Sequence, residues 1–215
     1  MKGKKADEAA SITLTRASRA TRGESLTRLA ASGAEVERIA GVFRAGASDR
    51  LLGPEATEAA VKRLSASGEL AHYRLIHFAC HGVLGSTDGL PPGLVLAQGG
   101  DQEGEDGYLR LDEVANLRLD ADLVVLSACQ TARGKRGRVE GVSSLGRAFL
   151  YAGCRGVVGS LWKVDDSATA DLMASFYTRL KAGRPAGEAL RATQLEAIAD
   201  DQPPYFWAPL ILLGR

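Results

Sequence analysis

The chain has 215 residues, of which 45% are apolar and 25% charged, a composition typical of globular rather than disordered or fibrous proteins. Lysine and arginine total 27 against 26 acidic residues, and this net charge of +1 argues against a partner that presents a nucleic-acid backbone. No apolar run reaches the roughly 18 residues that cross a bilayer, so no membrane partner is expected. Three cysteines are too few for a disulfide framework, which favours reduced thiols and a cytoplasmic location.

Residues 1–25 are poor in large apolar side chains, so we expect a poorly ordered or leader segment, in which Ile12–Thr15 has the pattern of a short edge strand. From residue 26 to 215, helical and strand patterns alternate within one domain. The pattern predicts a mostly parallel α/β sheet with helices on both faces. Helices are expected over 34–43, 55–66, 142–152, 167–181 and 186–199, and strands over 73–80, 93–97, 122–128, 156–161 and 208–213, with a strand end and helical turn over 109–117.

Two of the buried strands end in residues that can carry chemistry. The strand over 73–80 runs into His81 and Gly82, and the strand over 122–128 runs into Cys129. In open α/β sheets, sites form beyond the carboxyl ends of the strands. A strand–crossover–strand unit is therefore expected to bring His81 and Cys129 side by side.

A histidine next to a cysteine can perform nucleophilic catalysis. A free thiol has a pKa of about 8.5, so an imidazole within reach can take its proton and leave a thiolate that attacks a carbonyl carbon. The oxyanion that forms needs fixed donors, and the backbone N–H groups of Gly82 and Cys129 stand where strands open into loops. Against this, a cysteine at a strand end also occurs as a small buried apolar residue.

Other chemistries find less support. No phosphate-binding glycine loop of either common type occurs, so no nucleotide cofactor is expected. A zinc site drawn from the cysteines and histidines would lack any Cys-x-x-Cys pair, and no metal is expected. We interpret Cys80, Cys154 and His77 as residues of the core.

Several motifs in a fixed order carry a resemblance to a known family: residues 77–82 (HFACHG), 126–131 (LSACQT), 140–142 (EGV), 160–166 (SLWKVDD) and 205–209 (YFWAP). The chain resembles a CHAT domain, a branch of the caspase- and separase-like cysteine peptidases that is often attached to tetratricopeptide repeats. The resemblance implies a caspase-like three-layer sandwich, with His81 as catalytic histidine, Cys129 as nucleophile and Gly82 in the oxyanion hole.

The resemblance also implies a substrate and a partner. Asp165 and Asp166 lie where separase-like relatives place an acid that pairs with a basic side chain before the cleaved bond; alternatively, they cap the following helix. We therefore expect a cysteine endopeptidase acting on protein substrates after Arg or Lys, assisted by a tetratricopeptide-repeat module in cis or in trans. The basic loop 133–138 is either a solvated loop or a segment bordering the cleft. The alternative is a catalytically silent domain that serves interaction or signalling.

Overall fold

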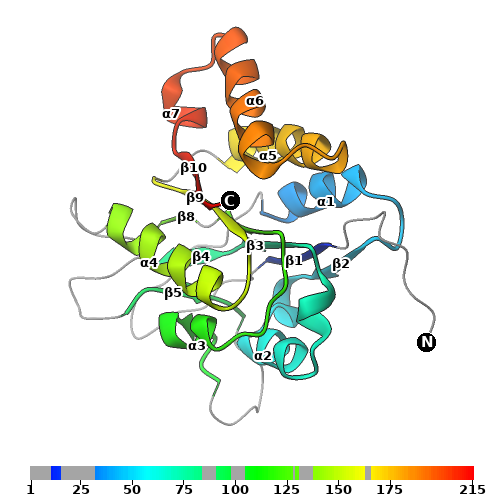
Figure 1. Cartoon of the computed structure of the whole chain (residues 1–215), viewed down its shortest axis with the longest axis vertical. Coiled ribbons are helices and arrows are strands. Elements are labelled where there is room, and N and C mark those ends of the chain that lie inside the picture. The colour runs from blue at the N-terminus through cyan, green and yellow to red at the C-terminus, as the bar shows by residue number, and fades with distance from the viewer. Residues whose placement is uncertain are drawn as a thin grey trace.

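The structure is a computed structural model that describes residues 11–15, 32–83, 91–97, 105–127, 129–130, 138–162 and 166–215. For residues 11–15, 129–130, 138–141 and 166–168 the description covers the backbone. The chain forms a mixed α/β fold in which helices pack on both faces of a central sheet (Figure 1).

The central sheet has six strands in the order β10-β9-β7-β3-β1-β2. All neighbouring strands are parallel except β10, which runs antiparallel to β9. Buried β-branched and leucine side chains make the inner strands β3, β7 and β9 apolar on both faces, as expected for parallel strands covered by helices. The strands are β1 (Ser11–Thr15), β2 (Ser48–Leu51), β3 (Leu75–Ala79), β7 (Leu123–Leu126), β9 (Gly156–Ser160) and β10 (Leu210–Gly214).

A smaller sheet of four short strands lies beyond the carboxyl ends of β3 and β7, in the order β6-β5-β4-β8. Strands β4 and β5, and β5 and β6, are antiparallel, whereas β4 and β8 are parallel. These strands are β4 (His81–Val83), β5 (Gly93–Val95), β6 (Tyr108–Arg110) and β8 (Cys129–Gln130).

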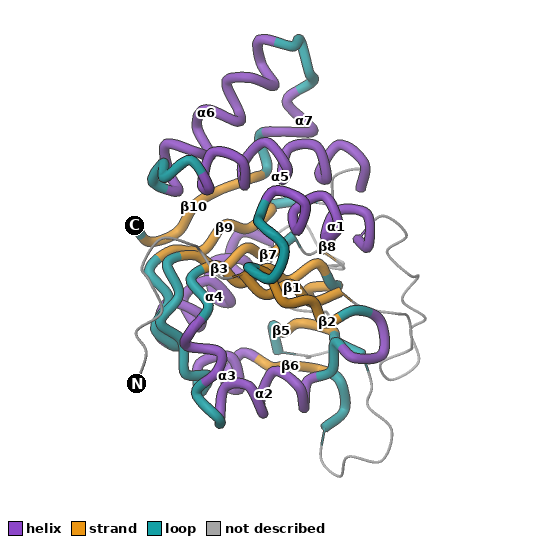
Figure 2. Tube along the Cα trace, turned by 90° about the vertical axis from the view of Figure 1, so that its right-hand side faces the viewer, coloured by secondary structure: helices purple, strands orange, loops and turns teal. Residues whose placement is uncertain are grey.

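The helices form two layers, one on each face of the central sheet. Figure 2 shows α5 and α6 on one side of the sheet and α2 and α3 on the other. The first layer consists of α1 (Ser32–Val42), α5 (Asp166–Lys181) and α6 (Ala186–Ala199). The second consists of α2 (Glu58–Ala66), α3 (Leu111–Ala115) and α4 (Arg138–Tyr151), and the short α7 (Pro204–Trp207) joins α6 to β10.

Alternation along β3 explains why an apolar core lies on each face of the central sheet. Leu75 packs with α5 and α6, whereas Ile76 and Phe78 pack with α4 on the other face. Successive side chains of a strand point to opposite faces, so one apolar strand contributes to both helix layers. The structure thus confirms the expected α/β fold with a mostly parallel sheet between two helix layers.

Some expectations need correction. Ser11–Thr15 form a strand, but it pairs with both β2 and β3 and is therefore an interior strand rather than an edge. Residues 1–10 and 16–25 lie outside the described residues, so the leader segment expected over 1–25 stays a prediction. The basic loop after Cys129 lies outside the described residues except for Arg138, which begins α4. The antiparallel direction of β10 was not expected, because an apolar pattern carries no information on strand direction.

Candidate active site

The candidate site depends on two chain segments that stay in register from one sheet to the next. In the central sheet, Leu75 to Phe78 of β3 pair with Leu123 to Leu126 of β7, each partner lying 48 residues further along the chain. Both segments then leave the central sheet and enter the small sheet. The β3 segment bends at Cys80 and continues as β4, and the β7 segment leads to β8. There His81 pairs with Cys129, again with an offset of 48 residues.

This register places the backbones of His81 and Cys129 directly beside each other. Neighbouring strands lie about 4.8 Å apart, so the two residues occupy adjacent positions at the carboxyl ends of two central strands. The side chain of His81 is buried, 5% exposed, and on its other side β4 pairs with Val95 of β5. The structure therefore juxtaposes the two residues whose chemistry the sequence singled out.

Gly82, the expected oxyanion-hole residue, follows His81 in β4 and pairs with Gln130 of β8 and Leu94 of β5. The expected substrate-binding residues are placed less fully. Asp166 is the first residue of α5, which follows β9, the strand beside β7. Its backbone therefore follows the same carboxyl edge of the sheet, whereas Asp165 lies outside the described residues.

The two other cysteines lie in the core, as expected. Cys80 is fully buried and Cys154 is 6% exposed, and both belong to the apolar cluster on the α4 side of the sheet. Burial raises the pKa of the Cys154 thiol to about 12, so this thiol stays protonated at neutral pH. Neither residue has the electropositive, partly exposed surroundings that activate a cysteine.

His77 is also a core residue, and it belongs to a buried polar group. Its Nδ1 lies 2.9 Å from the Tyr177 hydroxyl of α5, and its Nε2 lies 3.3 Å from a carboxylate oxygen of Glu35 on α1. All three residues are at most 5% exposed in the structure. Burial, together with the nearby Glu35 charge, raises the pKa of Tyr177 well above its ordinary value, so Tyr177 remains a neutral phenol. The group fixes α1 and α5 to β3, the strand that leads to His81.

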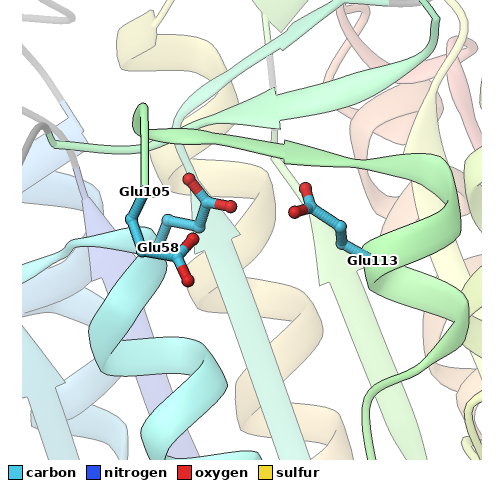
Figure 3. Close-up of side chains that lie close together, drawn as sticks. All are labelled: Glu58, Glu105 and Glu113. Carbon is cyan, nitrogen blue, oxygen red and sulfur yellow. The ribbon is translucent and has the colours of Figure 1, made fainter. Parts of the chain in front are cut away.

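Sequence reasoning missed a carboxylate cluster beside the small sheet. Figure 3 shows Glu58 of α2, Glu105 before β6 and Glu113 of α3 pointing toward one another, with ligand oxygens within 4.8 Å. Lys62 occupies the centre: its Nζ lies 2.7 Å from Glu58, 2.6 Å from Glu105 and 2.7 Å from Glu113. The three carboxylates thus already coordinate an ammonium group, and the cluster acts as an ion-pair tie between three elements.

The cluster is anchored to the small sheet by backbone hydrogen bonds. Gly107 N–H donates to Glu58, and Arg110 N–H donates to Glu113, at 2.9 and 2.7 Å. Burial, and a hydrogen bond shared with Glu105, raise the pKa of Glu58 to about 7. Glu58 lies more than 40 residues before Glu105 and Glu113, so no local spacing in the sequence brings the three glutamates together.

The fold and the paired strand ends define a caspase-like α/β protein. Comparison with known proteins identifies the family: the chain belongs to the CHAT domain family, whose model matches residues 3–215. This family is related to the caspase-like peptidases, so the chain is a member of a peptidase-related group.

Among curated proteins, the chain is similar to tetratricopeptide repeat protein 28. It is 37% identical to the mouse protein (Mus musculus) and 36% identical to the human protein (Homo sapiens), in each case over 106 residues. The matched stretch covers 47% of this chain and 4% of each relative, so it represents a small part of their length. Within the part of the chain that the structure describes, none of the helices combines the length and the apolar character needed to cross a membrane.

Proposed function

We propose that the protein is a cysteine endopeptidase in which His81 and Cys129 form a catalytic dyad. The observation that carries the proposal is the parallel pairing of His81 with Cys129 at the carboxyl ends of two neighbouring strands. Membership of a peptidase-related family supports the proposed peptidase activity. The small sheet holds the two backbones in a fixed relation, which a proton transfer between their side chains requires.

In the proposed reaction, the His81 imidazole takes the proton of the Cys129 thiol, and the thiolate attacks the carbonyl carbon of the substrate peptide bond. The imidazolium then donates that proton to the leaving amine as the C–N bond breaks, which leaves a thioester on Cys129. A water molecule, deprotonated by His81, hydrolyses the thioester and releases the acid product and the free thiol.

The oxyanion of each tetrahedral intermediate needs donors that are already in place. We assign this role to the backbone N–H groups of Gly82 and Cys129. A glycine at position 82 leaves room for the substrate carbonyl to approach the backbone closely.

For substrate selection, we assign the recognition of a basic side chain to Asp165 and Asp166. Asp166 begins α5 beyond the strand next to β7, which is compatible with a carboxylate near the candidate dyad. A carboxylate pairs with the fork of an arginine or the ammonium of a lysine, so we propose cleavage after these residues.

We further propose that the domain works with a tetratricopeptide-repeat module in cis, in the cytoplasm. Support for the module comes from the curated relatives, whose name states that they contain such repeats. Because the chain matches only 4% of those relatives, the protein used in functional tests should carry any repeats encoded beside the domain.

The proposal is tested with a fluorogenic peptide library that varies the residue before the cleaved bond. Both Cys129→Ala and His81→Ala should lower kcat/KM by at least about 10³-fold, because each removes a participant in the chemical step. His72→Ala is the matched control: this exposed histidine lies at the end of the short helix Glu69–His72, and its loss should leave kcat/KM unchanged. Cleavage that survives both dyad changes would overturn the assignment, and absence of any cleavage by the repeat-bearing protein would favour the silent interaction domain.

A further inference from the structure

A cavity of about 760 Å³ lies at the edge of the central sheet opposite the candidate dyad. Leu75 and Leu123, the first residues of β3 and β7, form part of its wall. The ends of α1 and α5 and the start of α6 complete the wall. Its volume is in the range of pockets that hold small molecules.

The wall of this cavity is strongly basic. The whole chain has a net charge of only +1, yet among the described residues six basic side chains and one acidic side chain line the cavity. Positive charge is thus concentrated at one place on a nearly neutral protein, which attracts anions. The basic residues are Arg44, Arg74, Arg155, Lys181, Arg184 and Arg215.

Two of these guanidinium groups are held in place by ion pairs. Arg74 and Arg155 both contact Asp122, each at 2.5 Å, and Arg155 also contacts Asp120 at 2.9 Å. Asp120 and Asp122 offset the charge of these two guanidinium groups but also hold them in place, and the basic excess of the wall comes from the remaining four basic side chains. A side chain that is already ordered loses less entropy when it binds a ligand.

The start of α6 adds backbone donors to the same wall. Ala186 and Gly187 open the helix and line the cavity, and Pro185 stands at the N-cap without a side-chain hydrogen bond to the helix. The first N–H groups of a helix have no partner within it, and a helix N-terminus with free N–H groups binds phosphate and carboxylate well. The basic side chains and the helix N-terminus therefore favour the same class of ligand.

We propose that this cavity binds a small anion that carries two or more phosphate groups. Phosphate oxygens accept paired hydrogen bonds from guanidinium groups and from helix N–H groups, and several phosphates match the several basic side chains. Phe43 and Leu180 also line the cavity, and their apolar side chains can contact an organic part of the ligand. The site lies at the opposite end of β3 and β7 from His81 and Cys129, so the proposal does not rest on the proposed peptidase activity.

The test is calorimetric titration of the full chain with inorganic tripolyphosphate. Lys181→Gln combined with Arg184→Gln removes two exposed charges from the wall and should weaken binding by about tenfold or more. The matched control combines Arg63→Gln with Arg147→Gln, which removes two exposed charges from α2 and α4, and should change affinity by less than about twofold.

A second pair of variants tests the helix N-terminus. Pro185→Asp places a carboxylate at the N-cap of α6, where it competes with the ligand, whereas Pro185→Asn places a neutral side chain of the same shape there. Both residues are favoured at an N-cap, so circular dichroism should show both variants folded. Tripolyphosphate should bind the Asp variant at least about tenfold more weakly than the Asn variant.

Three results would overturn the proposal. Equal losses in the cavity variant and its control would mean that tripolyphosphate is attracted by overall charge alone. Equal affinity of Pro185→Asp and Pro185→Asn would remove α6 from the site. Tighter binding of a hexa-aspartate peptide than of tripolyphosphate would show that the cavity recognises acidic polypeptide rather than a phosphorylated small molecule.

Discussion

At the scale of single residues, Asp166 begins α5 beside the carboxyl edge of the sheet, and we propose that it recognises the substrate's basic side chain. If its carboxylate pairs with a basic substrate side chain, Asp166→Asn should lower kcat/KM for peptides with Arg or Lys before the cleaved bond by about tenfold or more. Cleavage of other peptides should change little. Asp200→Asn, at the end of α6, is the control and should leave the preference intact; an unchanged preference in Asp166→Asn would refute the assigned role.

Gly153 determines how α4 ends. Its φ is +114°, and a Cβ at this position would lie 2.2 Å from the carbonyl oxygen of Leu119. Gly153→Ala should therefore lower the free energy of unfolding by about 2–4 kcal/mol, through backbone strain and through the clash.

Gly183→Ala is the matched control for that change. Gly183 also has a positive φ, +83°, but a Cβ there would meet no atom within 4 Å. Gly183→Ala should lower the free energy of unfolding by about 1 kcal/mol, because it introduces backbone strain but no clash. Urea denaturation of both variants measures the difference, and equal losses would show that contact with Leu119 is not what requires glycine at position 153.

At the scale of elements, the ion-pair cluster ties α2, α3 and the small sheet together, and it should make stability depend on pH. Burial raises the pKa of Glu58 from 4.5 to about 7, so the folded protein holds this proton more tightly than the unfolded chain does. The resulting stabilisation is complete below pH 4.5 and is lost as the pH rises to about 7.

Glu58→Gln replaces the titrating carboxyl with a neutral group of the same shape. Between pH 5 and pH 7.5, wild type should lose about 2 kcal/mol of unfolding free energy relative to this variant. Urea denaturation across that range measures the difference. Glu55 is exposed at the end of the short helix Gly53–Glu55, so the unfolding free energy of Glu55→Gln should depend on pH as that of wild type does. Parallel pH profiles of Glu58→Gln and wild type would contradict the raised pKa of Glu58.

Much of this architecture could be predicted from the sequence, because local pattern encodes it. The helices α5 and α6 begin and end within one residue of their expected bounds, since turn-forming residues and glycine flank the apolar pattern. The break at Cys80 and the strand β4 after it could not be predicted, because Cys80 belongs to the apolar run and His81–Val83 is too short to show a strand pattern. Only tertiary pairing with β5 and β8 diverts the chain into a second sheet.

Some residues of the candidate site and its surroundings could also be predicted from the sequence, and others could not. His81 and Cys129 could be paired from sequence, because parallel strands bring their carboxyl ends to one edge of a sheet. Glu35 and Tyr177, which contact or surround His77 in the core, gave no signal, because helix periodicity does not show which strand a buried polar side chain will face. The Lys62 cluster was missed because its members come from three elements.

At the scale of the whole molecule, the central sheet has two edges with different chemistry. Its carboxyl edge leads to His81 and Cys129 in the small sheet, and its amino edge faces the basic cavity beside α6. Both edges are built by the same strands, β3 and β7, whose apolar faces are covered by two helix layers. The rigid core thus holds a candidate catalytic site and a candidate anion site apart.

The central claim is that His81 activates Cys129, and alkylation of the native protein by iodoacetamide tests it most directly. Mass spectrometry follows Cys129 as a function of pH, with buried Cys80 and Cys154 as internal controls that should stay unmodified. In wild type, the reaction of Cys129 should have its midpoint well below the free-thiol pKa of about 8.5, and His81→Ala should return the midpoint to about that value. Coincident profiles for wild type and His81→Ala would contradict the account.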